Sequence, residues 1–366
     1  MNEFMRIGDI CDILNGYAFK SSKYVADGIR VIRITNVQKG FVEDTNPQYY
    51  PVSEQREIEK YMLCEGDLLM SLTGNVGRVG LLSAEMLPAA LNQRVACIRI
   101  RNPAVIYKPF LFHLLNSDYF ENKCILASQG VAQKNMSTEW LKEYPIPSFS
   151  MDKQMEIASI FDKIDDLIAH RKEQVRNMDQ AVKSRFIELF GDPVINPKGF
   201  PCYTVGEVID FQGGSQPDKK YFEYEASPDN IRLIQIRDYK SDKYITYIPK
   251  TMAKRFCTAD DIMIGRYGPP IFQILKGIEG SFNVALMKAT PKMGNREFVR
   301  QFLKQDCLLE YLEGLSKRTA GQNGIQMDKL KAYPFPYPPM ELQEQFAAFV
   351  EQTDKSKLCG KMEVAA

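Results

Sequence analysis

The chain has 366 residues, of which 45% are hydrophobic and 25% charged, and these fractions are ordinary for a globular protein. Its net charge of +1 means that any nucleic-acid surface must be a local patch, not a general positive field. No run of about 18 uncharged apolar residues occurs, and residues 1–6 lack a signal-peptide pattern. We therefore expect a cytoplasmic protein with no membrane segment and room for two domains of about 150 residues each.

An internal repeat determines the predicted architecture. The matched stretches, first copy against second, are 6–13 with 204–211, 29–34 with 231–236, 66–70 with 260–264, 90–93 with 281–284, 132–136 with 321–325, and 144–147 with 333–336. They recur in the same order, which makes chance similarity a poor explanation. The chain is predicted to be two copies of one mixed module, each of about 150 residues and each leading into a helix.

Taken in chain order, residues 31–37 and 94–100 alternate in polarity and are predicted strands, and 107–115 and 299–313 have the apolar spacing of helices. Proline-rich stretches at 145–147 and 334–339 predict a stiff exit from each module, because proline continues neither element.

The glycine-rich stretch 74–80 lies between two strand-like segments and lacks the G-x-G-x-x-G spacing. A turn is the favoured interpretation, and the alternative is a loop that approaches a DNA backbone.

A long amphipathic helix is predicted over residues 152–191. The apolar positions of its heptad seam are Phe161, Ile164, Ile168, Val175, Met178, Val182 and Leu189, with Arg171 and Arg185 in the two remaining places. Gly191 and Pro193 end it. About 38 residues make a rod roughly 57 Å long. Because a rod with one apolar stripe cannot cover itself, it needs a second long helix, from this chain or from a partner.

The second copy ends differently from the first. Residues 342–350 begin another helix, which is expected to reach Lys357 before 358–360 and a short tail. The predicted organisation has four parts, namely a first domain at 1–150, a spacer helix at 151–192, a second domain at 193–339 and a shortened helix at 340–366.

The residues offer little for catalysis. His113 and His170 are the two histidines, and both are interpreted as structural. The eight cysteines form no C-x-x-C pair, which favours reduced, buried thiols. No P-loop, nuclease pattern or Asn/Asp-Pro-Pro-aromatic run occurs. We expect a protein that binds and does not catalyse, with no metal, no cofactor and no small-molecule substrate.

Polar side chains beside turns are candidates for DNA contact, since Arg, Asn and Gln read base edges while Lys, Ser and Thr hold phosphates. In the first copy they are Lys20, Ser21, Asn36, Thr73, Asn75, Arg78, Asn92, Arg94, Gln133, Lys134 and Asn135. In the second copy they are Lys219, Lys220, Arg237, Lys240, Arg266, Tyr267, Asn283, Arg318, Gln322 and Asn323. The alternative for each is a solvated turn residue. The recurrence of Asn92 as Asn283 indicates a shared role, either in DNA contact or as a structural cap.

The chain resembles the specificity subunit of type I restriction-modification enzymes. The resemblance covers nearly the whole chain and is carried most specifically by 144–147 running into Gln154, by 186–193, and by the duplicate at 333–349. It implies an α+β fold of two tandem mixed α/β target-recognition domains separated by a long coiled-coil helix, with a second helix at the C-terminus.

The resemblance also implies a function. Each domain would read one half of a bipartite, asymmetric target in double-stranded DNA. The two helices would pack antiparallel as a spacer and dock modification subunits, which carry S-adenosylmethionine and methylate adenine, while a separate motor subunit cuts. A non-catalytic scaffold that binds protein partners is the alternative, and salt-sensitive binding to duplex DNA would distinguish the two.

The sequence departs from this family after Lys357, where the pattern expects a second helix as long as the first. One hypothesis is a truncated product of a shifted reading frame or a recombined variant. The seam from Arg171 to Leu189 is then expected to be exposed or covered by another chain, and docking of a second modification subunit is in doubt.

Overall fold

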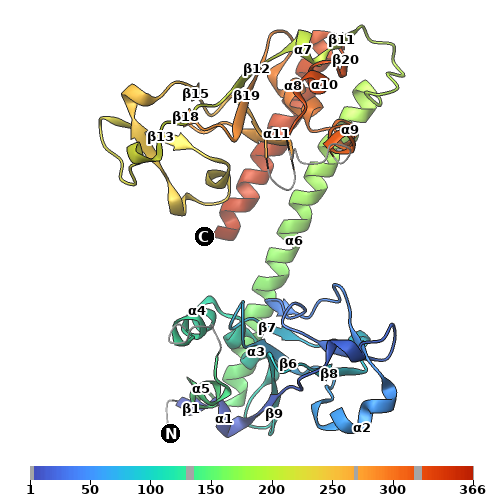
Figure 1. Cartoon of the computed structure of the whole chain (residues 1–366), viewed down its shortest axis with the longest axis vertical. Coiled ribbons are helices and arrows are strands. Elements are labelled where there is room, and N and C mark those ends of the chain that lie inside the picture. Colours follow the sequence, from blue (N-terminus) through green and yellow to red (C-terminus); the bar gives the residue numbers. More distant parts are fainter. Residues whose placement is uncertain (1–3, 129–135, 268–270, 317–323, 366) are drawn as a thin grey trace. The chain divides into compact units, whose positions relative to one another are not determined.

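The structure is a computed structural model that describes residues 4–128, 136–267, 271–316 and 324–365 (Figure 1). In its last helix, side chains are described as far as Lys357. The chain divides into two compact units, Met1–Ile168 (unit 1) and Ala169–Ala366 (unit 2). Helix α6 (Met151–Phe190) contributes residues to both units.

Unit 1 is built on two sheets. The larger has the strand order β2-β9-β6-β7-β4, and the smaller has the order β5-β3-β8, in which β3 and β8 are parallel. A separate pair, β1 with β10, joins the start of the domain to its exit. The strands are β1 (Phe4–Arg6), β2 (Cys11–Asn15), β3 (Ile29–Ile32), β4 (Gly40–Phe41), β5 (Tyr49–Tyr50), β6 (Leu68–Ser71), β7 (Val79–Leu81), β8 (Ala89–Leu91), β9 (Val95–Ile100) and β10 (Pro145–Pro147). The helices that precede α6 are α1 (Ile7–Ile10), α2 (Gln55–Ile58), α3 (Lys108–Asn116), α4 (Asp118–Ala127) and α5 (Thr138–Glu143).

Unit 2 repeats this plan. Its sheets have the orders β12-β19-β16-β17 and β14-β13-β18-β15, and β13 is parallel to β18. The strands are β11 (Cys202–Thr204), β12 (Ile209–Gly213), β13 (Asn230–Ile234), β14 (Tyr247–Pro249), β15 (Phe256–Cys257), β16 (Ile262–Gly265), β17 (Gln273–Lys276), β18 (Gly280–Phe282), β19 (Leu286–Pro291) and β20 (Pro334–Pro336). The helices are α7 (Val205–Val208), α8 (Arg296–Leu303), α9 (Asp306–Ser316), α10 (Met327–Lys331) and α11 (Met340–Ala365).

The strand pairings confirm the internal repeat and the predicted α+β class. The order β2-β9-β6-β7 corresponds to β12-β19-β16-β17, β5-β3-β8 corresponds to β14-β13-β18, and β1-β10 corresponds to β11-β20. The proline-rich exits are the strands β10 and β20, which pair only with the first strand of their own domain. A two-stranded pairing tolerates proline there because each strand has a free edge.

The long helix is confirmed, since α6 runs over 40 residues from Met151 to Phe190. Most of its exposed apolar residues lie in its first half, where Phe161 is 47% exposed and Leu167 is 61% exposed, and Ile187 near its end is exposed as well. Toward its end, Phe186 and Phe190 are buried against Phe298 of α8 and Phe346 of α11. His170 lies on the exposed face of α6.

Two expectations about the helices of unit 2 are wrong. The second helix, α11, does not end near Lys357 but continues to Ala365. The seam from Arg171 to Leu189 is half-buried or buried throughout, because both α11 and the domain itself cover it. Lys357 pairs with Asp179 at 2.6 Å while Phe346 packs on Phe186, so α11 runs antiparallel to this part of α6.

Three further details differ from the predictions. The strand expected at 31–37 is β3, which ends at Ile32 and gives way to a turn. The helix expected at 299–313 is two helices, α8 and α9, separated near Lys304. Of the cysteines, Cys64 and Cys202 are exposed and not buried. The stretch 74–80 does form the turn between β6 and β7, as predicted.

Candidate nucleic-acid interface

In unit 1, loops that are distant in sequence meet at one edge of the larger sheet. Asn15 at the end of β2 pairs with Ala96 near the start of β9, and Val95 pairs with Ser71 at the end of β6. The hairpin 72–78 joins β6 to β7 at this same edge. The antiparallel register therefore places three loops side by side, namely the loop after β2, the loop before β9 and the β6–β7 hairpin. We call these three loops together the loop edge of unit 1.

Most of the residues predicted for unit 1 lie on or beside this loop edge, and they are Lys20, Ser21, Thr73, Asn75, Arg78, Asn92 and Arg94. Tyr17 forms an isolated β-bridge with Asn92, which ties the loop after β2 to the loop before β9. Lys20, Asn75 and Arg94 are exposed, whereas Arg78 is half-buried and donates from Nη1 to Gln38 Oε1 at 2.8 Å.

Unit 2 forms an equivalent loop edge. Gly213 of β12 pairs with Met287, and Leu286 pairs with Gly265 at the end of β16. Arg266 and Tyr267 follow β16 directly. The Arg266 guanidinium lies 5.4 Å from the centroid of the Tyr267 ring, and that ring is 48% exposed. The predicted residues Lys219, Lys220, Arg237 and Lys240 are exposed, and Asn283 precedes β19.

Asn92 and Asn283 occupy the same turn in the two units and serve it in the same way. Asn92 Oδ1 accepts from Arg94 N–H at 3.2 Å, and Asn283 Oδ1 accepts from Ala285 N–H at 3.1 Å. An added Cβ on Gly16 or Gly214 would meet the backbone of Asn92 or Asn283 at 2.2 and 1.9 Å. The geometry therefore favours the structural-cap interpretation for this matched pair over a primary role in DNA contact.

Asn36 is also occupied within the fold. It is 3% exposed, its Oδ1 accepts from Arg33 N–H at 3.0 Å, and its Nδ2 donates to the carbonyl oxygen of Glu43 at 3.1 Å. Asp238 holds the equivalent turn in unit 2 and accepts from Gln235 N–H at 3.0 Å. Burial raises the pKa of Asp238 above its usual range. The Asn36 amide thus has no free donor or acceptor aimed at a ligand.

The remaining predicted residues, namely Gln133, Lys134, Asn135, Arg318, Gln322 and Asn323, lie outside the described residues. Met136 is described, and its backbone N–H donates to Leu72 O at the loop edge of unit 1 at 2.9 Å.

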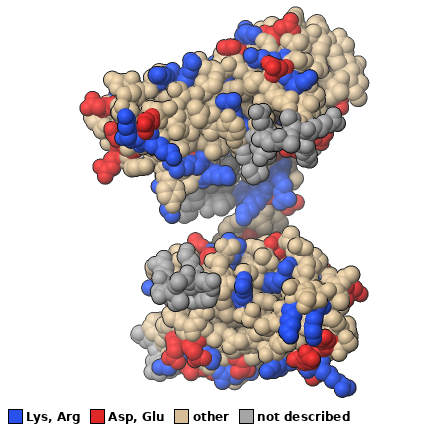
Figure 2. Space-filling model, in the orientation of Figure 1, with Lys and Arg blue, Asp and Glu red and all other residues tan. Residues whose placement is uncertain are grey.

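The electrostatics of both edges suit an anionic ligand. Within the described part of the chain, Lys20, Arg94, Arg237 and Arg266 form no direct ion pair with a carboxylate, although the charge of Lys20 acts on Glu54 and that of Arg237 on Asp238. Figure 2 shows Lys and Arg side chains on the visible face of both units with Asp and Glu among them, as expected for local patches and a net charge near zero. Unpaired cations beside turns are the usual donors to DNA phosphates.

Each long helix is fixed to its domain by one buried glutamine. Gln154 is fully buried, its Oε1 accepts from Tyr107 N–H at 2.8 Å, and its Nε2 donates to the carbonyls of Val105 and Phe149. Gln343 is equally buried, accepts from Asn295 N–H at 2.8 Å and donates to Pro338 O. A buried amide with all these partners holds the first turn of its helix in one orientation.

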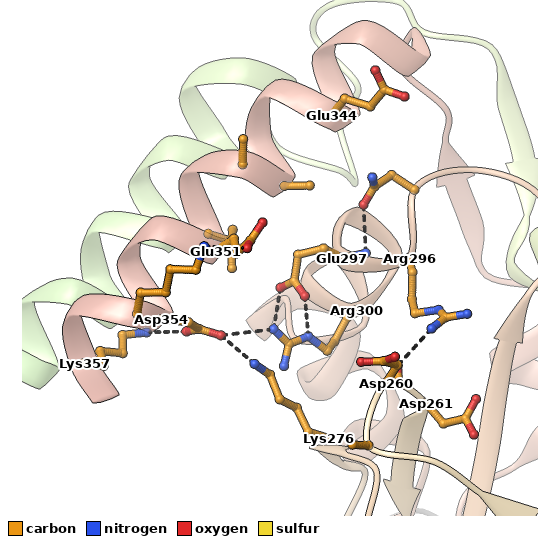
Figure 3. Close-up of a pocket in the computed structure, with 16 residues that line it drawn as sticks. Asp260, Asp261, Lys276, Arg296, Glu297, Arg300, Glu344, Glu351, Asp354 and Lys357 are labelled. Carbon is orange, nitrogen blue, oxygen red and sulfur yellow. Dashed lines mark hydrogen bonds and ion pairs between the residues drawn. The ribbon is translucent and has the colours of Figure 1, made fainter. Parts of the chain in front are cut away.

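A charged network adds a second attachment in unit 2 (Figure 3). Asp354 of α11 pairs with Lys276 at 2.8 Å and with Arg300 at 3.4 Å, and Arg300 also pairs with Glu297 at 2.6 Å. Burial opposes ionisation of Asp354, but its hydrogen bond to Lys276 and the nearby Lys357 and Arg300 hold its pKa at about 2. The groove beside this network, between α11 and α8, has a volume of about 850 Å³.

Tyr224, Lys243 and Tyr244 are exposed on unit 2 and are not among the predicted contacts. The sequence signal that distinguishes them is a position-by-position alignment of the two copies, in which unit 1 has other residue types at these places.

Among the described residues, no group of three His, Cys, Asp or Glu side chains is arranged to hold a metal ion. No described helix has both the length and the apolar character needed to cross a bilayer.

Comparisons with known proteins agree with one another. A family model described as the type I restriction modification DNA specificity domain matches residues 2–177 and again 197–360. The type I restriction enzyme MjaVIII specificity subunit of Methanocaldococcus jannaschii is 27% identical over 185 residues, which are 50% of this chain and 43% of that subunit. This chain therefore spans less than half of that relative.

A second relative, the putative type I restriction enzyme MjaX specificity subunit of the same organism, is 25% identical over 385 residues, which are 96% of this chain and 86% of that subunit. The crystal structure of a type I restriction-modification S subunit from M. genitalium matches with a TM-score of 0.52 and 15% identity, covering 99% of this chain and 91% of that one. At this identity the structural likeness shows the fold alone.

Proposed function

The chain belongs to the type I restriction-modification DNA specificity family, and on that premise we propose that each unit reads one half of a bipartite, asymmetric DNA target. The observation that carries this proposal is the duplicated loop edge, which presents unpaired cations and polar side chains at equivalent places on two copies of one domain. The reading domains are residues 1–150 and 193–339. The remaining predicted residues, such as the exposed Asn75 and Arg94 and the half-buried Arg266, supply the contacts to bases and phosphates.

The helices set the distance between the two readers. A continuous helix without proline or glycine between Met151 and Phe190 is stiff, and half-sites in successive major grooves are about 34 Å apart. The length of α6 would then determine the unread gap in the target. The loop edges would determine the sequences on either side of it.

The chain itself supplies no chemistry in this proposal. Modification subunits that carry S-adenosylmethionine methylate adenine, and a motor subunit acts through them in the cytoplasm. The exposed apolar residues Ile160, Phe161, Ile164 and Leu167 on α6 suit such docking, because apolar surface of this kind is stabilised when a partner helix covers it.

The experiment that tests the proposal is single-molecule sequencing of methylated adenines in cells with and without this gene, with the modification subunit present in both. We expect a two-part motif with a fixed gap to disappear when the gene is removed. An insertion of one helical turn in α6 should lengthen the gap and leave both half-sites unchanged, while replacing 193–339 should change one half-site only. Identical methylation in all strains, although the modification subunit copurifies with the chain, would favour the non-catalytic protein scaffold instead.

A further inference from the structure

Unit 2 carries a basic, aromatic depression that contains Arg237 and adds residues that were not among the predicted DNA contacts. It is lined by Tyr224, Arg237, Lys243 and Tyr244, together with Asp242 and Tyr247, and its volume is about 630 Å³. Tyr224 is 73% exposed and Tyr244 is 59% exposed, which is unusual for two large aromatic side chains on one small surface. Exposed rings beside cations indicate a binding surface.

The charges in this depression are not balanced. Asp242, its acidic residue, pairs with Arg232 Nη2 at 2.8 Å. Arg237 is held by a hydrogen bond from Nη2 to Thr246 Oγ1 at 2.9 Å, and Lys243 Nζ lies 5.4 Å from the Tyr244 ring centroid. Arg232 Nε also lies 3.8 Å from Asp238 Oδ2, and the charge of Arg237 acts on the same carboxylate. Three cations, Arg232, Arg237 and Lys243, therefore face two carboxylates, and the depression keeps an excess of positive charge.

The same place in unit 1 is built on the same framework. Arg30 pairs with Asp44 there as Arg232 pairs with Asp242, and Arg30 lies opposite Tyr49 as Arg232 lies opposite Tyr247. The register of these strands and turns aligns the lining residues pairwise, with Tyr224 at the position of Ala26, Arg237 at Thr35, Lys243 at Thr45, and Tyr244 at Asn46. Unit 1 therefore has the ion pair of the framework but carries no cation and no exposed ring at these four positions, and its Arg33 Nη2 donates instead to the backbone oxygen of Asn46 at 2.7 Å.

The depression adjoins the loop edge of unit 2. Arg237 follows Ile236, and Gly265 at the end of β16 leaves room for the Ile236 side chain, since an added Cβ would lie 2.9 Å from it. The segment that leads into Arg237 therefore packs against the end of β16, the strand that precedes Arg266. A ligand that covers the loop edge can extend into the depression.

The side-chain types identify the ligand. Lys, Arg and Tyr are all donors to phosphate oxygens, and phosphate contacts need point charges and hydroxyl groups more than a fixed bidentate geometry. Base edges are instead read best by bidentate Arg, Asn and Gln, and Lys243 and the two tyrosines do not supply that geometry. We propose that Tyr224, Arg237, Lys243 and Tyr244 bind the DNA backbone beside the half-site of unit 2, an inference that rests on the proposed function.

As a consequence, we expect the two units to contribute unequally to the affinity for DNA. Unit 2 supplies phosphate contacts that unit 1 lacks, so it carries the larger share of the salt-dependent, sequence-independent binding. Each phosphate contact contributes about 0.9 to the slope of log affinity against log salt.

The test measures binding of the full chain, alone and assembled with its modification subunits, to a fluorescent duplex of mixed sequence about 30 bp long, or three turns of B-DNA. Affinity is measured over a series of salt concentrations for the wild type and for Arg237→Thr, Lys243→Thr and Tyr244→Asn, which introduce the residues of unit 1. Lys355→Ala, on an exposed lysine of α11 that pairs with Glu351, is the matched charge control. Melting temperatures verify that the exposed substitutions leave the fold intact.

We expect Arg237→Thr and Lys243→Thr each to lower the slope by about 0.9, to weaken binding roughly tenfold at 0.1 M salt, and to do so equally for unrelated sequences. The control should keep the wild-type slope. Wild-type binding with unchanged slopes in the variants overturns the subsite and leaves the proposed function standing. An unchanged slope with altered sequence preference overturns the backbone assignment in favour of base reading. A wild type that binds no duplex DNA, even in the assembled complex, overturns both.

Discussion

The two units can be compared residue by residue, because the strand order β2-β9-β6-β7 of unit 1 recurs as β12-β19-β16-β17 in unit 2. Asp67 in unit 1 and Asp261 in unit 2 accept the same backbone N–H three residues earlier, at 2.8 Å in both. Gln154 and Gln343 anchor their helices through the same acceptor geometry. The two copies therefore share the groups that hold turns and helix starts in place.

They differ in the side chains that these turns present. Asn36 and Asp238 hold the same turn with an amide and a carboxylate, and the neighbouring positions carry Thr35 in one unit and Arg237 in the other. The comparison shows that one scaffold can display unrelated recognition surfaces, since buried polar groups are constrained by their partners and exposed ones are not. The predictions below test this separation.

The largest expected effect concerns α6, whose apolar side chains are buried at Phe186 in unit 2 and exposed at Phe161 in unit 1. Phe186→Ala should lower the free energy of unfolding by about 4 kcal/mol, because the ring is buried against Phe298 and Phe346. Phe161→Ala, on the exposed part of α6, should cost less than about 1 kcal/mol but weaken copurification with the modification subunit. Denaturant titrations followed by circular dichroism measure both. Equal losses of stability would contradict the described packing of α6.

The next prediction tests whether the turns at Asn92 in unit 1 and Asn283 in unit 2 have the same backbone structure. Gly16→Ala and Gly214→Ala should each cost about 3 kcal/mol, because the new methyl group would meet backbone atoms at about 2 Å. Gly314→Ala is the control, since nothing lies within 4 Å of its added Cβ in α9, and it should raise stability slightly. Thermal melts of the three variants measure these changes in stability. A Gly16→Ala variant as stable as wild type would show that the two turns are not equivalent.

A smaller difference is expected at the buried glutamines. Gln154→Ala removes three hydrogen bonds and should cost about 3 kcal/mol, whereas Gln343→Ala removes two and should cost about 2 kcal/mol. Gln154→Glu keeps the acceptor for Tyr107 N–H but turns a buried carboxylate oxygen toward the carbonyls of Val105 and Phe149, so it should be at least as destabilising as alanine. Stability and the methylated motif are the two readouts, because a loosened helix start should also relax the gap between the half-sites.

The smallest expected effect depends on pH and belongs to unit 2. The pKa of Asp354 is lowered from 3.8 to about 2, so its ionised form stabilises the folded state above about pH 4 and this contribution is lost as the pH falls toward 2. Because the side chain is 30% exposed, we expect about 1 kcal/mol after solvent screening. Asp354→Asn should be less stable than wild type by this amount at about pH 5 and equal to it near pH 2. A pH-independent difference would mean that packing and not charge holds α11 there.

A large part of this organisation follows from the order of residues alone. The repeat, the 40-residue helix and the family resemblance were all predicted correctly, because matched stretches, heptad spacing and proline-flanked exits are local patterns. The boundaries were less predictable. The apolar spacing continues across Lys304, so it does not show that α8 and α9 are separate helices. The glycine at 360 suggested an early end to the last helix, but α11 continues through it to Ala365.

The candidate DNA contacts were also predicted only in part from the sequence. Residue type alone selects Arg94, Arg237 and Arg266 as possible DNA contacts, but it selects Asn36, Asn92 and Asn283 equally. Only the tertiary structure separates them, because burial and hydrogen-bond partners decide whether an amide is committed to its own turn. Tyr224 and Lys243 are 19 positions apart and ordinary in isolation. Their meeting in one depression is decided by the pairing of β13 with β14 and by an ion pair that neutralises Asp242, which are interactions between residues distant along the chain.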